Sequence, residues 1–172
     1  KSISDFPILT KSILRDSTND LISDEFNIEN LDKHYRSGSS GIQSFTYMSK
    51  DHTFYLRALQ THWWTWSGYT VGDNLLQFGI SQQRSFLKTI KDFFLRCTYV
   101  KAFCLSDTEL QNTLKKVANK KSLYIAGYPS FINQLAKDSL ESKIKPDFSG
   151  FICFGDKLFE YYKNTILKAF GN

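Results

Sequence analysis

The segment Leu75-Leu76-Gln77-Phe78-Gly79-Ile80 opens the part of the sequence that decides the fold. It is an apolar run of the length of one buried strand, and a stretch with the apolar spacing of a helix follows it. Three further runs of this kind occupy residues 99–105, 123–126 and 151–154. Strands that alternate with helices are typical of βαβ units. The pattern therefore predicts a three-layer α/β fold, in which a mostly parallel sheet is flanked by helices.

The helices expected between these runs carry signals for their first and last residues. Ser106 and Glu109 have the spacing of a capping box. Ser130 and Asp156 are the expected N-caps of the next two helices, and Gly171 is the expected stop of the last one. The apolar stripes predicted to face the sheet are Leu110, Leu114 and Val117, then Ile132, Leu135, Ala136 and Leu140, then Phe159, Tyr162, Ile166 and Phe170.

Residues 1–50 are less regular, and we treat them as an N-terminal segment ahead of an α/β subdomain, one structural unit, at residues 51–172. Residues 6–11 are interpreted as a packed loop that leads into a short helix, and residues 42–48 alternate enough for a strand. Residues 51–68 are predicted to form a helix. Its apolar face contains Leu56, Leu59, Trp63 and Trp66, and an aromatic stripe of this kind favours core packing over ligand stacking.

The composition is that of a chain that forms a core. Apolar residues make up 41% of the 172 residues, with 15 Phe and 9 Tyr. This length suits one domain, although two are not excluded. The sequence shows no signal peptide and no apolar run of about 18 residues, the minimum for a membrane span. We therefore expect a cytoplasmic protein without a membrane partner.

The formal net charge of +5 favours anionic ligands in general. The densest basic stretch contains Lys115, Lys116, Lys120 and Lys121, and it is interpreted as a solvated helix face. An Arg-rich arm or a zinc-finger spacing would support nucleic-acid binding, and the sequence has neither. We therefore expect no nucleic-acid partner.

Cysteines and histidines do not form a metal motif. Cys97, Cys104 and Cys153 are an odd number without a close pair, and each stands among apolar residues. Buried free thiols are the interpretation. The three histidines, His34, His52 and His62, show no ligand spacing. We therefore expect no metal site and no catalytic base among them.

The one segment that suggests chemistry is Arg36-Ser37-Gly38-Ser39-Ser40-Gly41. Small residues let a backbone approach an anion, while amides and hydroxyls donate to it, and Arg36 adds a charge at the edge. A Ser-Gly run is also the usual composition of a flexible linker, so both interpretations stay open on composition alone. The segment matches neither the GxxxxGK[ST] nor the GxGxxG pattern.

With the two residues before it, His34 and Tyr35, this segment resembles the phosphate-binding motif of adenylate-forming enzymes, TSG[ST][ST]GxP. More closely, the chain resembles the phenylacetate–coenzyme A ligase and CapK (capsular polysaccharide biosynthesis) branch of that superfamily. Four more segments are similar to the branch's motifs, in the same order. They are Phe6-Pro7-Ile8-Leu9-Thr10-Lys11, Trp66-Ser67-Gly68-Tyr69-Thr70-Val71-Gly72-Asp73, Gly127-Tyr128-Pro129-Ser130 and Phe154-Gly155-Asp156-Lys157-Leu158. Taken singly, the last two segments are also ordinary turns at the start of helices.

The resemblance implies an enzyme that joins ATP and a small-molecule carboxylate into an acyl-adenylate, then transfers the acyl group to a thiol such as coenzyme A. It implies that residues 36–41 bind the ATP phosphates with Mg²⁺ nearby, and that Gly155, Asp156 and Tyr128 lie near the adenine and acyl groups. The sequence departs from the motifs at Arg36 (usually Thr), Gln43 (usually Pro) and Asp156 (usually Glu), and Ser44 replaces a lysine found in many relatives. These differences bear on ATP affinity.

The family's YGxTE motif, its ribose-binding Asp and its catalytic Lys would follow Asn172, so no catalytic residue is assigned. We interpret both ends of the chain as cuts and expect a C-terminal part of the same protein as a partner, an inactive fragment, and self-association through uncovered apolar surface. Three alternatives remain. They are transfer to a carrier protein or acyl-protein synthetase system, a non-catalytic α/β module that binds anions, and a scaffold whose Ser-Gly loop has no ligand.

Overall fold

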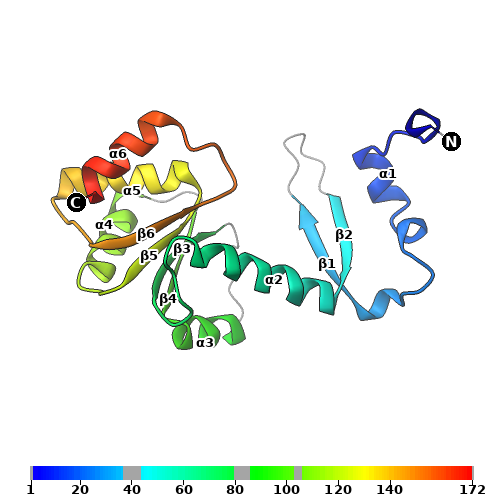
Figure 1. Ribbon diagram of the computed structural model, residues 1–172, viewed down its shortest axis with the longest axis horizontal. Helices are drawn as coiled ribbons and strands as arrows, with labels where there is room; N and C mark the ends of the chain where they lie inside the picture. Colours follow the sequence, from blue (N-terminus) through cyan, green and yellow to red (C-terminus); the bar gives the residue numbers. More distant parts are fainter. Residues whose placement is uncertain (1, 37–43, 80–85, 103–105, 172) are drawn as a thin grey trace. The chain divides into compact units, whose positions relative to one another are not determined.

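The computed structural model describes residues 2–36, 44–79, 86–102 and 106–171 of the chain (Figure 1). Its contacts divide the chain into two compact units, Lys1–Gln60 and Thr61–Asn172. Helix α2, Lys50–Thr65, begins in the first unit and ends in the second.

The second unit is built on a parallel sheet of four strands. These are β3 (Asn74–Gly79), β4 (Cys97–Lys101), β5 (Leu123–Gly127) and β6 (Phe148–Cys153). Their order is β4-β3-β5-β6, and every neighbouring pair is parallel. The predicted strands are therefore neighbours in one parallel sheet, which confirms the α/β prediction.

Helices flank this sheet on both faces, as Figure 1 shows: α3 (Phe86–Phe94) on one, and α4 (Asp107–Val117), α5 (Pro129–Ser142) and α6 (Glu160–Phe170) on the other. The chain goes from β3 through α3 to β4, then returns through α4 to β5, on the other side of β3. The direction of strand addition therefore reverses between β3 and β5. In open α/β sheets, ligands bind beyond the carboxyl ends of the strands at such a reversal.

Alternating strand residues supply the core on both faces of the sheet. Leu76 and Phe78 of β3 face α4, α5 and α6, and both are fully buried. On the other face, Leu75 and Tyr124 pack with Tyr69, which follows α2. The helix residues that complete the first core cluster are Leu110, Leu114, Val117, Ile132, Leu135, Ala136, Ile166, Ala169 and Phe170. Most of the predicted stripes are therefore confirmed, although Leu140 and Phe159 are 39% and 42% exposed.

The helix ends agree with the sequence in two cases and differ in two. The Ser106–Glu109 capping box is present at α4, and Gly171 ends α6 by donating its N–H to Leu167 O at 2.8 Å. Ser130 is not an N-cap, because α5 begins one residue earlier at Pro129, whose fixed φ favours the first helical position. Asp156 is not an N-cap either, since α6 begins at Glu160 and Phe159 precedes it.

The first unit contains a two-stranded antiparallel sheet. Strands β1 (Leu31–Arg36) and β2 (Ser44–Ser49) pair from Leu31↔Ser49 to Arg36↔Ser44. The sequence predicted β2 but missed β1, whose residues LDKHYR lack an apolar alternation. The segment before β1 also contains three short 3₁₀ turns, at Ile3–Asp5, Asn19–Leu21 and Ile28–Asn30.

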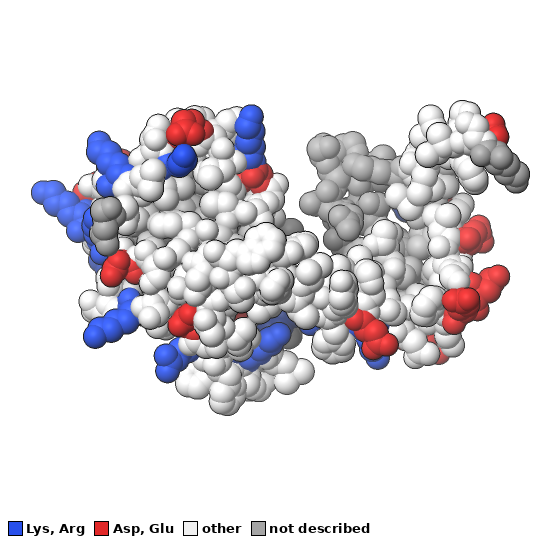
Figure 2. Space-filling view, viewed as in Figure 1, with Lys and Arg blue, Asp and Glu red and all other residues white. Residues whose placement is uncertain are grey.

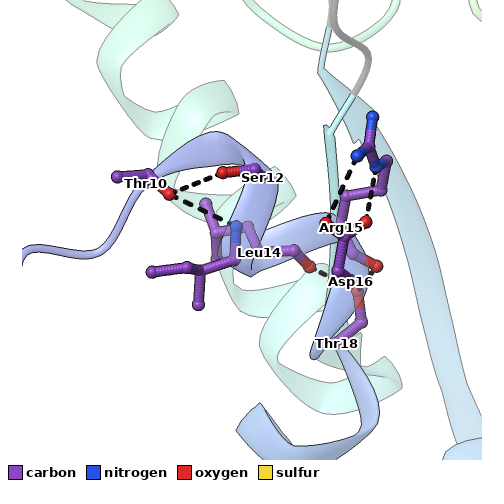
Figure 3. A network of polar contacts seen from close by, with 7 residues as sticks. Thr10, Ser12, Leu14, Arg15, Asp16 and Thr18 are labelled. Atoms are coloured by element: carbon purple, nitrogen blue, oxygen red, sulfur yellow. Dashed lines mark hydrogen bonds and ion pairs between the residues drawn. The ribbon is translucent and has the colours of Figure 1, made fainter.

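A small polar network holds helix α1 (Lys11–Asp16), as Figure 3 shows. Thr10 Oγ1 accepts from Ile13 N at 3.3 Å and so caps the first turn. After the helix, the Thr18 hydroxyl donates to Leu14 O. The predicted short helix is thus confirmed. The loop before it is not packed, because Phe6 and Ile8 are 64% and 84% exposed.

The aromatic face predicted for α2 is also not part of the core. Trp63 and Trp66 are 51% and 75% exposed. Trp64, which the predicted stripe left out, packs against Tyr69 at a ring-centroid distance of 5.9 Å. The helix was therefore predicted correctly, but its buried face was not. The side of α2 that packs toward the sheet contains Trp64 rather than Trp63 and Trp66.

Candidate site at the carboxyl ends of β5 and β6

Strands β5 and β6 end side by side, and three of the predicted site residues follow them directly. Gly127 and Cys153 are register partners at these ends. Just beyond, Phe154 N donates to Gly127 O at 3.1 Å, which carries the strand pairing one residue further. Tyr128 then follows β5, and Gly155 and Asp156 follow β6. Tyr128 is 27 positions before Gly155 in the sequence, yet it meets Gly155 and Asp156 at one edge of the sheet.

Gly155 and Tyr128 are in direct contact. Gly155 has φ +90°, in the left-handed region, and a Cβ built on it would collide with Tyr128 Cε1 and lie 2.5 Å from Cδ1. The half-buried Tyr128 ring also packs against Phe154 and Phe131, at centroid distances of 5.8 and 6.0 Å. A glycine is therefore required here for two reasons, the backbone conformation and the position of the ring.

Asp156 faces the beginning of α5. Its Oδ2 accepts a hydrogen bond of 3.4 Å from Ser130 N, in the first turn of the helix. A carboxylate at this place interacts favourably with the N-terminal end of a helix. Cys153 is exposed as a residue, but the protein around its sulfur removes part of the solvent, and this desolvation raises the pKa of the thiol; the Asp156 carboxylate raises it to a lesser extent. The Cys153 side chain is consequently held as a thiol and is not an activated nucleophile.

The predicted phosphate-binding residues are only partly described. Arg36 is the last residue of β1, and its backbone pairs with Ser44. Ser37, Gly38, Ser39, Ser40 and Gly41 lie outside the described residues. Arg36 belongs to the first unit, whereas Tyr128, Gly155 and Asp156 belong to the second. The structure thus brings the three expected adenine and acyl residues together.

Within the described part of the chain, no three His, Cys, Asp or Glu residues are grouped so that they could hold a metal ion. Mg²⁺ usually takes one or two carboxylates together with substrate phosphates, so Asp156 is a chemically suitable single ligand. Cys97 and Cys153 are free thiols, but Cys153 is exposed rather than buried, and Cys104 lies outside the described residues. The described helices include none that is long and apolar enough to span a membrane.

Two cavities elsewhere were not predicted from the sequence. A cavity of about 630 Å³ in the first unit is lined mainly by apolar side chains of α1, β2 and the turns between them. Thr46 Oγ1 is buried at this cavity without a hydrogen-bond partner among the described residues. A second cavity, of about 550 Å³, lies at the amino ends of β3 and β4 and is lined by several basic residues. No sequence motif marks either cavity, because the residues that line each one come from several helices, strands and turns.

Among solved structures, this fold is similar to part of a ligase. The chain is similar to 2-hydroxyisobutyryl-CoA ligase in complex with 2-HIB-AMP and CoA in the thioesterification state, with a TM-score of 0.59, 19% identity and coverage of 99% of this chain and 39% of that one. An open conformation of the same ligase, also with 2-HIB-AMP and CoA, gives a TM-score of 0.57, 18% identity and coverage of 96% and 38%.

The chain therefore spans about two fifths of the length of these ligase structures. No family model and no curated protein matches the sequence. At this identity, the likeness establishes the fold: a parallel α/β sheet flanked by helices, arranged as in the corresponding part of a CoA ligase.

Proposed function

We propose that this chain is the N-terminal part of an ATP-dependent, carboxylate-activating ligase. The reaction forms an acyl-adenylate and pyrophosphate, and the acyl group then passes to a thiol such as coenzyme A. The observation that carries the proposal is the match of nearly the whole chain to a CoA ligase whose structures contain an acyl-adenylate and CoA.

The arrangement of Tyr128, Gly155 and Asp156 supports the proposal independently. The three residues come from two sequence motifs, and they meet at the carboxyl edge of a parallel sheet, where ligands of such folds bind. A flat aromatic ring beside an exposed glycine backbone offers one surface for a planar base. Asp156 and the amides at the start of α5 offer polar groups next to that surface.

ATP would supply the leaving pyrophosphate, and residues 36–41 would hold its phosphates. Donors directed at a departing pyrophosphate stabilise the charge that develops there. Tyr128 and Gly155 would orient the adenine or acyl group, and Asp156 would keep the first turn of α5 in place beside it. Mg²⁺ would be held chiefly by the phosphates.

Within this class, the motif order favours the phenylacetate–coenzyme A ligase and CapK branch, which would make an aryl or similar small carboxylate the substrate. An acyl-protein or carrier-protein synthetase uses the same first step and differs only in the acceptor. A non-catalytic module that binds anions is the alternative from a different class. Acid-dependent pyrophosphate release distinguishes the enzymes from the module, and the acceptor required for acyl transfer distinguishes the two enzymes.

The experiment compares two proteins: the chain Lys1–Asn172 and the longer protein that we propose contains it. Each is incubated with ATP, Mg²⁺ and a panel of aryl and fatty acids, and pyrophosphate is measured. We expect acid-dependent release from the longer protein and none from Lys1–Asn172, because half of a site cannot position both reactants. Strong release by Lys1–Asn172 alone would show that the chemistry lies elsewhere in this chain than proposed.

A further inference from the structure

The excess of positive charge belongs to the second unit. Residues 61–172 contain 15 Lys and Arg against 9 Asp and Glu, whereas residues 1–60 contain 7 against 8. In the face shown in Figure 2, blue Lys and Arg are frequent on the second unit, and red Asp and Glu prevail on the first. A net positive unit attracts anions, but only a cavity with converging cations can select one. The cavity at the amino ends of β3 and β4 has this property.

Three cations and one carboxylate line that cavity. Arg96 lies between α3 and β4, Lys116 lies in the last turn of α4, and Lys120 lies in the turn before β5. Asp92 of α3 is the carboxylate. Within the described residues, no ion pair joins Arg96, Lys116 or Lys120 to a carboxylate. The cavity therefore carries positive charge that this part of the protein does not neutralise.

Lys120 is fixed in place rather than solvated. Its Nζ donates to Thr98 Oγ1 at 2.9 Å, and Thr98 is only 6% exposed. Burial, together with the nearby Lys116 ammonium, lowers the pKa of Lys120. The Lys116 charge disfavours the charge on Lys120, and a bound anion would relieve that repulsion. The interpretation of all four lysines as a solvated face therefore fails at Lys120.

Phe93 gives the cavity an apolar wall. It lines the cavity, and it is 80% exposed, so its ring faces a ligand or solvent rather than the core. A phosphate alone would not use this wall, whereas the organic group of a phosphate monoester would cover it. The volume of about 550 Å³ accommodates a small molecule of that kind.

We propose that this cavity binds a phosphate monoester, with Arg96, Lys116 and Lys120 around the phosphate and Phe93 against the organic group. The site lies at the amino ends of the strands, whereas Tyr128, Gly155 and Asp156 lie at the carboxyl ends. It is therefore separate from the proposed ligase site, and either proposal can fail without the other.

The test is isothermal titration of the chain with inorganic phosphate and with phenyl phosphate. We expect phenyl phosphate to bind more tightly, and Phe93→Ala to weaken phenyl phosphate binding while leaving inorganic phosphate binding unchanged. Lys116→Gln, which changes an exposed side chain, should weaken both ligands about tenfold through the lost charge-assisted contact. The double variant Lys116→Gln/Lys120→Gln should abolish binding.

The matched control is Lys115→Gln/Lys121→Gln. It removes the same charge from the same stretch, and Lys115 shares the last turn of α4, but neither lysine lines the cavity. We expect it to bind both ligands like the wild type. If the control weakened ligand binding as much as Lys116→Gln/Lys120→Gln, the binding would come from the general positive charge of the unit, and the proposal would be overturned. Equal affinity for phenyl phosphate and inorganic phosphate would overturn it as well.

Discussion

The Tyr128 ring lies against Gly155 at the carboxyl edge of the sheet, in space that a Cβ at position 155 would occupy. The two residues are joined through the ends of neighbouring parallel strands, β5 and β6. A change at one residue should therefore depend on what occupies the other.

Gly155→Ala tests this dependence. A left-handed alanine should lower the free energy of unfolding by about 1 kcal/mol, and the collision with Tyr128 should lower it by about 1–3 kcal/mol more. Gly72→Ala is the control, since Gly72 has φ +107° but nothing within 4 Å of a new Cβ. Urea unfolding should show a greater loss for Gly155→Ala than for Gly72→Ala. In the background of Tyr128→Ala the difference should shrink, and an unchanged difference would mean that the ring is not the cause.

Tyr124 and Gly68 give a second prediction. The Tyr124 hydroxyl donates to Gly68 O at 2.9 Å and ties the turn after α2 to the centre of the sheet. Tyr124 is 9% exposed, so Tyr124→Phe leaves the carbonyl without this donor and should lower the free energy of unfolding by about 1 kcal/mol. Tyr55→Phe, at a residue 63% exposed, should leave it unchanged. Equal effects of the two variants in urea unfolding would contradict the assignment.

Asp138 predicts how stability depends on pH. It is 5% exposed, and its Oδ2 has no hydrogen-bond partner among the described residues. Burial raises its pKa, and a side-chain hydrogen bond with Gln111 opposes part of that rise. Because the folded state binds this proton more tightly than the unfolded state, the group lowers stability as pH rises above the unfolded value of about 3.9. Asp138→Asn should therefore raise the free energy of unfolding at pH 7 by about 1 kcal/mol and change it little at pH 3. A loss of stability at pH 7 would show that the hydrogen bond with Gln111 outweighs the cost of burying the charge, and would contradict the prediction.

Glu109 predicts the opposite trend. The backbone N–H and the hydroxyl of Ser106 donate to its carboxylate and lower its pKa. A lowered folded pKa gives stability that is present above the unfolded pKa and lost as pH falls through the folded one. Glu109→Gln should flatten the acid side of the melting-temperature profile. If the melting temperature of the variant fell with pH as steeply as that of the wild type, the Glu109 carboxylate would not contribute to acid sensitivity as described.

The sequence predicted the second unit better than the first, and the reason is physical. Buried parallel strands such as β5 are continuous apolar runs, so their positions are readable without knowing their partners. Strand β1 is polar and owes its conformation to pairing with β2, which the local sequence does not reveal. The helix start predicted at Ser130 was wrong because Pro129 at the first helical position outweighed a preferred capping side chain. The start predicted at Asp156 was wrong because α6 begins only at Glu160.

The candidate site was predictable only where a motif and a strand end coincide. Gly127-Tyr128-Pro129-Ser130 and the segment around Gly155 each follow a strand, so the neighbouring positions of Tyr128 and Gly155 follow from the parallel sheet. The basic cavity was not predictable, because Arg96 and Lys120 belong to different connections around β4 and meet only through the strand order. Charge counting detected the lysines but not their arrangement.

The most direct test of the proposed function is acid-dependent ATP–pyrophosphate exchange by the longer protein, measured for the wild type, Gly155→Ala and Gly72→Ala. We expect Gly155→Ala to lower exchange at least about tenfold below Gly72→Ala at equal folded fraction. The reason is that Tyr128 would be displaced from the carboxyl edge of the sheet, where we propose that the nucleotide binds, so the reactants would no longer be positioned. Equal exchange by the two variants would contradict a role for Tyr128 and Gly155 in the reaction, and no acid-dependent exchange by the folded wild type would contradict the ligase itself.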